Sequence, residues 1–196
     1  DEIIVGKDSK ATLLNVTAND KDIDGDPLVI DTVDYSGEGS VELKEGKLLY
    51  TPKAGFYVKE SFNYTLVDAN DYSSTASVNL VINSLPVVAD DAYTVKEGSK
   101  DNELNVLAND SDADNGDFSL EIAAVNYSGK GTVKASNGWL LYTPAKGFHG
   151  TEQFTYTVKD QYGGTAEAKV TMSVKEKSKG LFGGSFGWGV LFLIPL

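Results

Sequence analysis

The sequence contains no cysteine and a single histidine, His149. The absence of cysteine excludes disulfide bonds, thiolate metal sites and a thiol nucleophile. One imidazole cannot form a histidine metal cluster, and we expect His149 to be a loop residue. The chemistry open to this chain is therefore limited to its carboxylates, hydroxyls, amides and amines.

Positive charge is also in short supply. The chain has 17 Lys and Arg against 29 Asp and Glu, which gives a formal net charge of -12. Such a surface repels phosphate backbones and anionic lipid, and it favours cations as partners. We therefore expect no nucleic-acid binding.

Strong helix formers are sparse, and helical periodicity occurs nowhere, whereas Val, Thr, Tyr, Ser and Gly are abundant. Apolar and polar residues alternate with period two, which places one set on the buried face of a sheet. The expected inward-facing residues are Phe62, Tyr64, Leu66, Ala76, Val78, Leu80 and Ile82, then Phe154, Tyr156, Val158, Ala166, Ala168, Val170, Met172 and Val174. About seven short strands fit each half, which predicts an all-β protein of Greek-key sandwiches.

The chain repeats itself after about ninety residues. The matching segments keep their order, and they include 18–20 with 108–110, 35–37 with 127–129, 48–52 with 140–144, 55–56 with 147–148 and 62–65 with 154–157. We expect two independent sandwiches, residues 1–84 and 85–176, joined end to end by a short, stiff linker over 85–91.

The densest polar feature is an aspartate loop in which four carboxylates alternate around a glycine. It contains Asp20, Asp22, Asp24 and Asp26, and its counterpart in the second half contains Asp110, Asp112, Asp114 and Asp117. Unit charges about 5 Å apart repel by roughly 0.8 kcal/mol per pair even in water, and a cation would remove that cost. Calcium takes six to eight oxygen ligands and suits such a loop, although the absence of flanking helices rules out an EF-hand.

The alternative is an ordinary solvated turn, because Asn, Asp and Gly favour turns without any metal. The second loop has one residue inserted before its glycine, so we expect the first loop to bind calcium more tightly. Further acids could complete sites between the two halves, namely Asp68, Asp160, Asp90, Asp91 and Glu97.

Catalysis is not expected, because the acids lie in turns that recur in both halves, which suits a structural role better than a single active site. Tyr57 occupies the place of His149 in the first half, so no imidazole-based triad is possible there. Trp139 replaces Lys47 of the first half, and it either packs at a sheet edge or offers a stacking surface for sugar or protein.

The composition changes after Val174, and residues 177–196 form a Gly-rich, hydrophobic tail. Its last apolar run, from Phe186, is eleven residues, fewer than the roughly twenty needed to span a bilayer. The segment Gly183-Gly184-Ser185-Phe186-Gly187-Trp188 resembles a glycine-glycine C-terminal sorting signal of some Gram-negative bacteria, which implies processing by a rhomboid-type protease. We expect contact with a membrane only through this tail.

The runs Asn-Asp-x-Asp-x-Asp-Gly-Asp at 19–26, Tyr-Thr-Pro-x-x-Gly-Phe at 50–56 and Ser-Phe-x-Tyr-Thr-Leu-x-Asp at 61–68 resemble bacterial cadherin-like or Ig-like tandem repeats. The resemblance covers residues 1 to about 176. It implies a large exported protein in which copies form stalks, often stiffened by calcium. We expect an extracellular or cell-surface spacer or adhesion element, whose partner is a surface protein or carbohydrate. The alternative is a carbohydrate-binding accessory module of a larger secreted enzyme.

Overall fold

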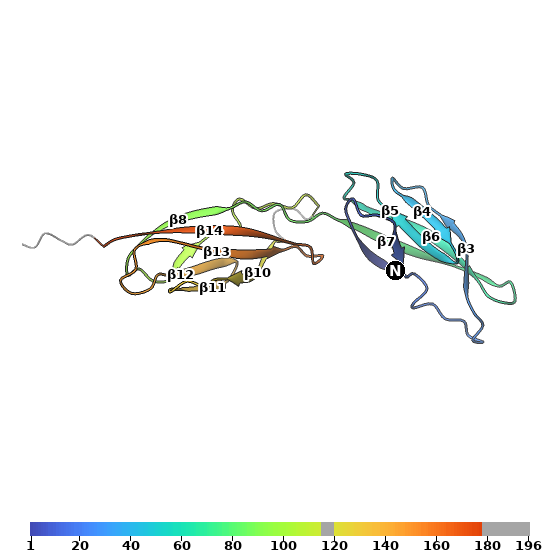
Figure 1. Cartoon of the computed structure of the whole chain (residues 1–196). Coiled ribbons are helices and arrows are strands. Elements are labelled where there is room, and N and C mark those ends of the chain that lie inside the picture. Colours follow the sequence, from blue (N-terminus) through green and yellow to red (C-terminus); the bar gives the residue numbers. More distant parts are fainter. Residues whose placement is uncertain (115–119, 178–196) are drawn as a thin grey trace, which may run out of the picture.

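The computed structural model describes residues 1–114 and 120–177, and these form fourteen strands and no helix. The predicted all-β fold of two tandem sandwiches is confirmed, and the sandwiches lie end to end (Figure 1). Within the described ranges, no helix has the length and apolar character needed to cross a bilayer. The predicted sorting tail lies outside the described residues, apart from Lys177 at its start.

The first sandwich packs a four-stranded sheet of order β1-β7-β6-β3 against a three-stranded sheet of order β2-β5-β4. All pairs are antiparallel except β1 with β7, which are parallel. Its strands are β1 (Glu2–Gly6), β2 (Thr12–Leu14), β3 (Val29–Asp34), β4 (Ser40–Lys44), β5 (Lys47–Thr51), β6 (Lys59–Val67) and β7 (Ser73–Asn83).

The second sandwich repeats this topology, with sheets of order β10-β13-β14-β8 and β11-β12-β9. Its parallel pair is β8 with β14. The register shift in β3 between Ile30 and Thr32 recurs in β10 between Ile122 and Ala124. The strands are β8 (Asp91–Lys96), β9 (Asn102–Leu104), β10 (Glu121–Asn126), β11 (Thr132–Ser136), β12 (Trp139–Thr143), β13 (Gly150–Lys159) and β14 (Thr165–Lys175).

Each sandwich has its own apolar core. The alternation predicted from sequence holds, because Phe62, Tyr64 and Leu66 of β6 are all buried, as are Phe154, Tyr156 and Val158 of β13. Only the alanines at the start of β7 and β14, Ala76 and Ala166, remain half-buried. The two core clusters share no residue. The repeat therefore builds two hydrophobic cores rather than one continuous core.

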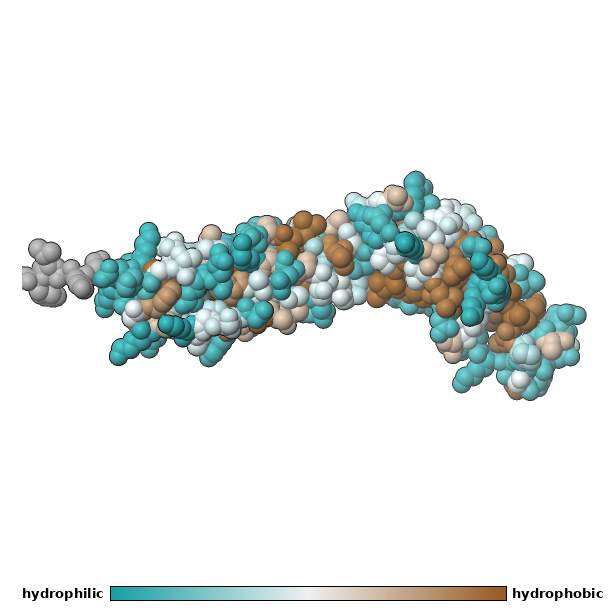
Figure 2. All heavy atoms as spheres, in the orientation of Figure 1, coloured by the Kyte–Doolittle hydropathy of each residue, from teal (hydrophilic) through white to brown (hydrophobic). Residues whose placement is uncertain are grey.

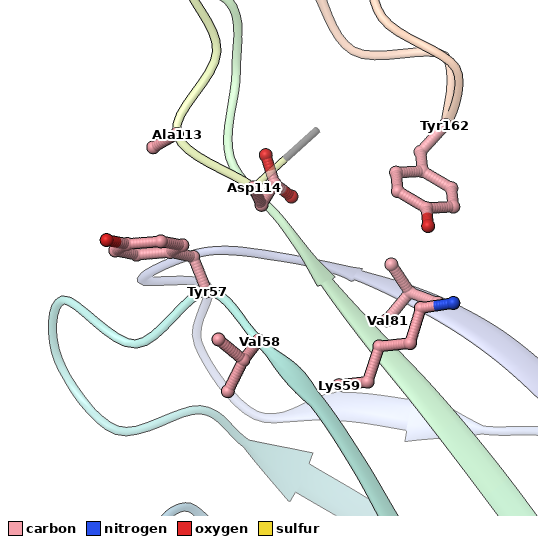
Figure 3. A pocket seen from close by; sticks show the side chains of 7 residues that line it. All are labelled: Tyr57, Val58, Lys59, Val81, Ala113, Asp114 and Tyr162. Atoms are coloured by element: carbon pink, nitrogen blue, oxygen red, sulfur yellow. The ribbon is translucent and has the colours of Figure 1, made fainter. Parts of the chain in front are cut away.

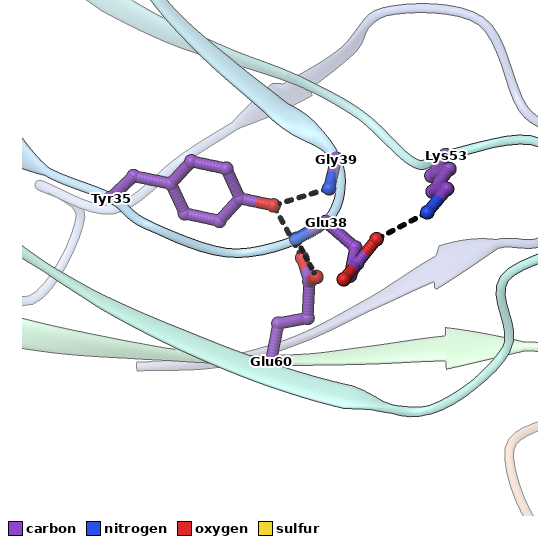
Figure 4. Close-up of polar contacts among 5 residues, drawn as sticks. All are labelled: Tyr35, Glu38, Gly39, Lys53 and Glu60. Atoms are coloured by element: carbon purple, nitrogen blue, oxygen red, sulfur yellow. Dashed lines mark hydrogen bonds and ion pairs between the residues drawn. The ribbon is translucent and has the colours of Figure 1, made fainter.

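The half-buried carboxylate of Glu60 joins the two sheets of the first sandwich at one corner (Figure 4). Glu60 accepts hydrogen bonds from the hydroxyls of Tyr35 at 2.6 Å and Tyr50 at 2.7 Å, and from the backbone N–H of Glu38 at 2.7 Å. Burial, reinforced by the Glu60 carboxylate, raises the pKa of Tyr35 to about 12. In the second sandwich, Tyr127 donates to Glu152 in the same way, so the corner is a structural feature of the repeat.

The linker is shorter than the sequence indicates. Val87 pairs with Ser111, Val88 packs against the second core, and Asp91 is the first residue of β8, so the chain from Val87 onward belongs to the second sandwich. The first sandwich and the junction carry most of the exposed apolar surface visible in Figure 2. In the second sandwich, Trp139 at the start of β12 is 40% exposed.

Candidate functional site

The first aspartate loop is held together by its own carboxylates. Asp22 Oδ1 accepts hydrogen bonds from the backbone N–H groups of Asp24 at 2.8 Å and Asp26 at 3.0 Å, and Gly25 has a φ of 86° at the bend. The backbone N–H of Asp26 is the main cause that lowers the pKa of Asp22. Asn70 Nδ2 donates to Asp26 Oδ2 at 2.7 Å. Asp22 therefore caps backbone N–H groups of its own loop, as in an ordinary Asp-rich turn.

Asp20 and Asp110, the first acids of the two loops, each contact a buried tyrosine hydroxyl rather than the other acids of their loop. The Tyr64 hydroxyl contacts Asp20 Oδ2 at 2.7 Å and the Val16 carbonyl at 2.9 Å, with Asp1 Oδ2 at 3.3 Å. Tyr156 does the same with Asp110 at 3.1 Å, the Val106 carbonyl at 2.9 Å and Asp91 at 2.9 Å. Burial is the main cause that raises the pKa of both Asp91 and Asp110. Each sandwich therefore places two carboxylates around one buried tyrosine.

The second aspartate loop is more enclosed than the first. Asp112 is only 7% exposed, whereas its counterpart Asp22 is half-buried. The Asp114 N–H donates to Asp112 Oδ1 at 3.2 Å. Burial, with the neighbouring Asp112 carboxylate as the next cause, raises the pKa of Asp114 to about 6. Asp117 lies outside the described residues.

This enclosure comes from the end of the first sandwich. The backbone N–H of Ser84 donates to Asp114 Oδ2 at 2.9 Å, and the Asn83 side-chain amide donates to Asp160 Oδ2 at 2.9 Å. Asp160 is 1% exposed, and its Oδ1 accepts the N–H groups of Tyr162 at 2.8 Å and Gly164 at 2.7 Å. The second loop and the turn after β13 therefore meet the last residues of the first sandwich at a polar junction.

Gly164 allows this close approach. A Cβ at this position would lie 2.8 Å from Asn83 Nδ2 and 2.9 Å from Leu85 Cδ2, and closer still to Asp160 Oδ2. The equivalent residue of the first sandwich is Tyr72, and there Asp68 makes the same turn hydrogen bonds, to the N–H groups of Asn70 and Tyr72, while staying half-buried. The two turns therefore differ at one position, where Gly164 leaves room for Asn83 and Leu85 and the first sandwich has Tyr72.

Three oxygens buried at the junction have no hydrogen-bond partner: Asn83 Oδ1, Asp112 Oδ2 and Asp114 Oδ1. A buried acceptor without a donor costs about 1–3 kcal/mol, and more when it is charged. All three are hard oxygen atoms of the type that calcium prefers, and they come from both sandwiches. The junction therefore leaves three buried oxygen acceptors, drawn from both sandwiches, without a donor.

The described residues contain no group of three or more acidic or histidine side chains placed to hold a metal ion. What the junction offers is a pair of carboxylates, Asp112 and Asp114, together with the amide oxygen of Asn83. Asn83 and Ser84 were not among the residues expected from sequence. The available signal was their position, directly before Leu85-Pro86 at the start of the linker.

The other acids predicted near the linker have different partners. Asp90 accepts the Lys169 N–H at 2.9 Å and pairs with its ammonium group at 3.3 Å. Glu97, which was expected to help complete a site between the sandwiches, lies at the opposite end of the second sandwich, because β8 runs away from the junction. There Glu97 accepts the N–H of Lys177, and its own N–H donates to the Lys175 carbonyl.

A cavity of about 280 Å³ opens between the two sandwiches beside Asp114. Tyr57 and Val58 line it from the first sandwich, and Tyr162 lines it from the second. Figure 3 shows the two tyrosine rings on opposite sides, with Asp114 between them. The cavity thus combines aromatic walls with a carboxylate.

The profile of one protein family, described as bacterial Ig domain, matches the chain twice, over residues 1–81 and 83–173. The chain therefore belongs to the bacterial Ig domain family, and the resemblance inferred from its repeats is confirmed. No curated protein matches the sequence.

Similar solved structures include the PcdhgB3 EC1-4 fragment, with 17% identity and a TM-score of 0.39, covering 89% of this chain and 48% of that one. A titin I-band fragment has 12% identity and a TM-score of 0.41, covering 90% and 62%. Drosophila N-cadherin EC1-4 has 13% identity and a TM-score of 0.35, covering 89% and 47%. The chain thus spans about half to two thirds of the length of these structures.

Proposed function

We propose that this chain is a non-catalytic, extracellular spacer or adhesion segment of a bacterial surface or secreted protein, whose two sandwiches are fixed in line by calcium at their junction. Membership of the bacterial Ig domain family supports the spacer role. The end-to-end arrangement of two separate cores suits a segment that extends a larger protein outward.

The observation that carries the proposal is the set of unpaired oxygens of Asn83, Asp112 and Asp114. Asn83 is 6% exposed and Asp112 is 7% exposed, so bulk water does not satisfy these atoms. Burial and the neighbouring Asp112 carboxylate raise the pKa of Asp114 to about 6, so this end of the loop favours added positive charge. A divalent cation would supply that charge and accept electron pairs from all three oxygens.

Calcium suits this donor set better than magnesium does. Calcium tolerates irregular shells of carboxylate, carbonyl and water oxygens, whereas magnesium demands a near-octahedral shell and gives up its water reluctantly. The sequence predicted that the first loop binds calcium more tightly, whereas this proposal assigns the higher calcium affinity to the second loop. The reason is that the second loop gains ligands from the first sandwich, while Asp22 of the first loop faces its own backbone.

An ion bound across the junction would make it a stiff joint. A cation that binds the folded, closed junction and no other state stabilises it by about 2.7 kcal/mol at a hundredfold excess over its dissociation constant. Among residues 1–114 and 120–177, direct hydrogen bonds span the junction from Asn83 to Asp160 and from Ser84 to Asp114. A gain of that size would shift the junction strongly towards the closed state.

Isothermal titration calorimetry with calcium tests the proposal. Wild type should bind, and the double variant Asp112→Asn with Asp114→Asn should bind at least about tenfold more weakly, a loss of about 1.4 kcal/mol. The matched control changes the equivalent residues of the first loop, Asp22→Asn with Asp24→Asn, and should keep the junction affinity. Equal affinity of wild type and the junction variant would contradict the assignment.

A second candidate function, carbohydrate binding, is favoured by the cavity in Figure 3. Aromatic rings such as those of Tyr57 and Tyr162 can stack on the apolar faces of sugars, and Asp114 can accept sugar hydroxyls. A glycan array probed with wild type and with Tyr57→Ala tests it. Binding that is lost in the variant would support this function, and the absence of any bound glycan would leave the spacer role alone.

A further inference from the structure

The hairpin between β11 and β12 of the second sandwich turns through two residues, Asn137 and Gly138. Ser136 and Trp139 form the last pair of the ladder on either side of them. Both turn residues have positive φ, 50° for Asn137 and 80° for Gly138, which is the conformation of a type I′ turn. Both are exposed. The turn therefore stands in solvent at the tip of the hairpin.

An asparagine that is followed by glycine has both partners of a cyclisation reaction. The electrophile is the Cγ carbon of the Asn137 side-chain amide, and the nucleophile is the backbone nitrogen of Gly138, which reaches Cγ by closing a five-membered ring. The usual obstacle is the side chain of the following residue, and glycine has none. Among the described residues, nothing lies within 4 Å of the place where a Cβ of Gly138 would be. The surrounding chain therefore leaves room for the backbone to move as the ring closes.

The equivalent turn of the first sandwich has the same shape without the reactive pair. Lys44 and Lys47 flank Glu45 and Gly46, whose φ angles are 52° and 74°. The two turns thus share one backbone geometry and differ in the first turn residue. A glutamate carboxylate has no amide group to lose, and its longer side chain would have to close a six-membered ring. The first sandwich therefore provides an internal control.

We propose that Asn137 is a modification site at which the chain deamidates itself. The Gly138 nitrogen forms a bond to Cγ of Asn137, the bond from Cγ to Nδ2 breaks, and Nδ2 leaves as ammonia with the proton from the Gly138 nitrogen. The product is a cyclic succinimide, and water then opens one of its two carbonyl groups. One opening gives aspartate, and the other gives isoaspartate, in which the main chain runs through the side-chain carbon. Water is the co-reactant, and no group is oxidised or reduced.

The two products differ in their effect on the hairpin. The position accepts an acid, because Glu45 occupies it in the first sandwich with the same positive φ. Isoaspartate adds one main-chain atom to a two-residue turn, and the register of a hairpin depends on the length and type of its turn. Aspartate should therefore leave the fold intact, whereas isoaspartate should break the pair of Ser136 with Trp139 and loosen the ends of β11 and β12.

The inference is independent of the calcium proposal and of the spacer role. Asn137 belongs to the hairpin of the sheet β11-β12-β9, whereas the junction is formed by the loop of Asp112 and Asp114 and by the turn after β13. Deamidation should therefore proceed at the same rate in calcium and in chelator. A failure of either proposal leaves the other standing.

The test is incubation of the full chain at mildly alkaline pH, followed by tryptic peptide mapping with mass spectrometry. Cleavage after Lys134 and Lys146 places Asn137 in the peptide 135–146. A second asparagine–glycine pair, at 115–116, lies outside the described residues and falls in a different tryptic peptide, so it does not interfere. Peptide 135–146 should gain the mass difference between an NH2 group and a hydroxyl group, and it should separate into an aspartate form and an isoaspartate form.

Asn137→Gln is the matched control, because it keeps the amide and has the side-chain length of Glu45, which the same turn accepts. It should deamidate at least about tenfold more slowly than wild type, since its ring would have six members. Wild type should also react more slowly at mildly acidic pH, because the attacking nitrogen must lose its proton. An unmodified peptide 135–146, after a time in which a synthetic peptide of the same residues has converted, would overturn the proposal. Aspartate without isoaspartate would also overturn it, because direct hydrolysis by water gives aspartate alone.

Hydrogen exchange followed by NMR tests the effect assigned to isoaspartate. Asn137→Asp should keep the wild-type exchange rate at the Trp139 amide, and the isoaspartate form, separated by chromatography, should exchange there at least about tenfold faster. Equal exchange in the two forms would show that the added main-chain atom does not disturb the hairpin, and it would overturn this part of the proposal.

Discussion

The side-chain amide of Asn83, at the end of the first sandwich, donates a hydrogen bond of 2.9 Å to the carboxylate of Asp160 in the second. Both residues are buried, at 6% and 1% exposure. The Asn83 amide oxygen, at the other side of the same group, has no partner. One side chain thus satisfies an acid of the next sandwich and presents a free ligand at the junction.

Asn83→Ala should weaken the junction without unfolding either sandwich. The change leaves Asp160 Oδ2 buried without its donor, which costs about 1–3 kcal/mol and more for an ionised acceptor. Limited proteolysis at Leu85 to Ala89 should become faster, while far-ultraviolet circular dichroism stays the same. Cleavage at the wild-type rate would show that the Asn83 contact contributes little.

Gly164→Ala should also open the junction, for a steric reason. The added Cβ meets Asn83 Nδ2 at 2.8 Å and Leu85 Cδ2 at 2.9 Å, so the first sandwich must move away. Overpacking of this kind costs about 1–3 kcal/mol. Small-angle X-ray scattering should show a changed distance distribution between the two sandwiches.

Gly6→Ala is the control for this variant, because nothing lies within 4 Å of a Cβ at Gly6. Gly6 ends β1, in the first sandwich close to the junction. Its scattering curve should match that of the wild type. If Gly164→Ala also matched the wild type, the close packing at Gly164 would not set the arrangement of the sandwiches.

Glu60→Gln should destabilise the first sandwich by about 1–3 kcal/mol at neutral pH, because two tyrosines and a backbone N–H lose a charged acceptor. Burial by itself raises the pKa of Glu60, but the hydrogen bonds from Tyr35, Tyr50 and the backbone outweigh it, so the net shift is downward. A lowered pKa stabilises the fold above the unfolded value near 4.3, and this contribution is lost as pH falls through the folded value. Urea unfolding at several pH values should show the difference from wild type shrinking below about pH 4.

Glu38→Gln supplies the comparison, since Glu38 pairs with Lys53 on the surface near the same corner (Figure 4). Exposed ion pairs contribute about 0–1 kcal/mol, so this variant should unfold almost as wild type does. A cost as large as that of Glu60→Gln would mean that net charge, rather than the hydrogen bonds to Glu60, explains the effect.

Tyr156→Phe should raise the pKa of Asp91 and Asp110 further, because their shared hydroxyl donor is lost. Burial already raises the pKa of both acids. For a carboxyl whose folded pKa exceeds the unfolded value, stability falls as pH rises through that window. The deficit of the variant should therefore be larger at pH 7 than at pH 4, and carboxyl NMR titrations should show both shifts. Tyr72→Phe, at an exposed tyrosine, should leave them unchanged.

The sequence predicted the fold well because period-two alternation and internal repetition are local signals. Phe62, Tyr64 and Leu66 could be assigned to one buried face from their spacing alone, and the structure buries all three. The equivalence of the two aspartate loops was also readable, because Asn19-Asp20 and Asn109-Asp110 align without gaps. Patterns of this kind depend only on neighbouring residues, so they can be interpreted without knowing the tertiary structure.

The junction could not be predicted in the same way, because it depends on how one sandwich sits against the next. Asp22 and Asp112 are equivalent in sequence, but Asp112 is buried in a loop whose Asp114 accepts a hydrogen bond from Ser84 of the preceding sandwich. Nothing local to Asn83 marks it as a partner of Asp160, which lies 77 positions away. Glu97 shows the converse, since its proximity to the linker in sequence is undone by the direction of β8.

Residual dipolar couplings of the full chain, measured in calcium and then in chelator, test the central claim most directly. With calcium across the junction, both sandwiches should fit a single alignment tensor. In chelator, each sandwich should need its own alignment tensor. The double variant Asp112→Asn with Asp114→Asn should need two tensors both in calcium and in chelator. A single tensor shared equally well by wild type in calcium and in chelator would contradict the account, because the junction would then be fixed without any cation.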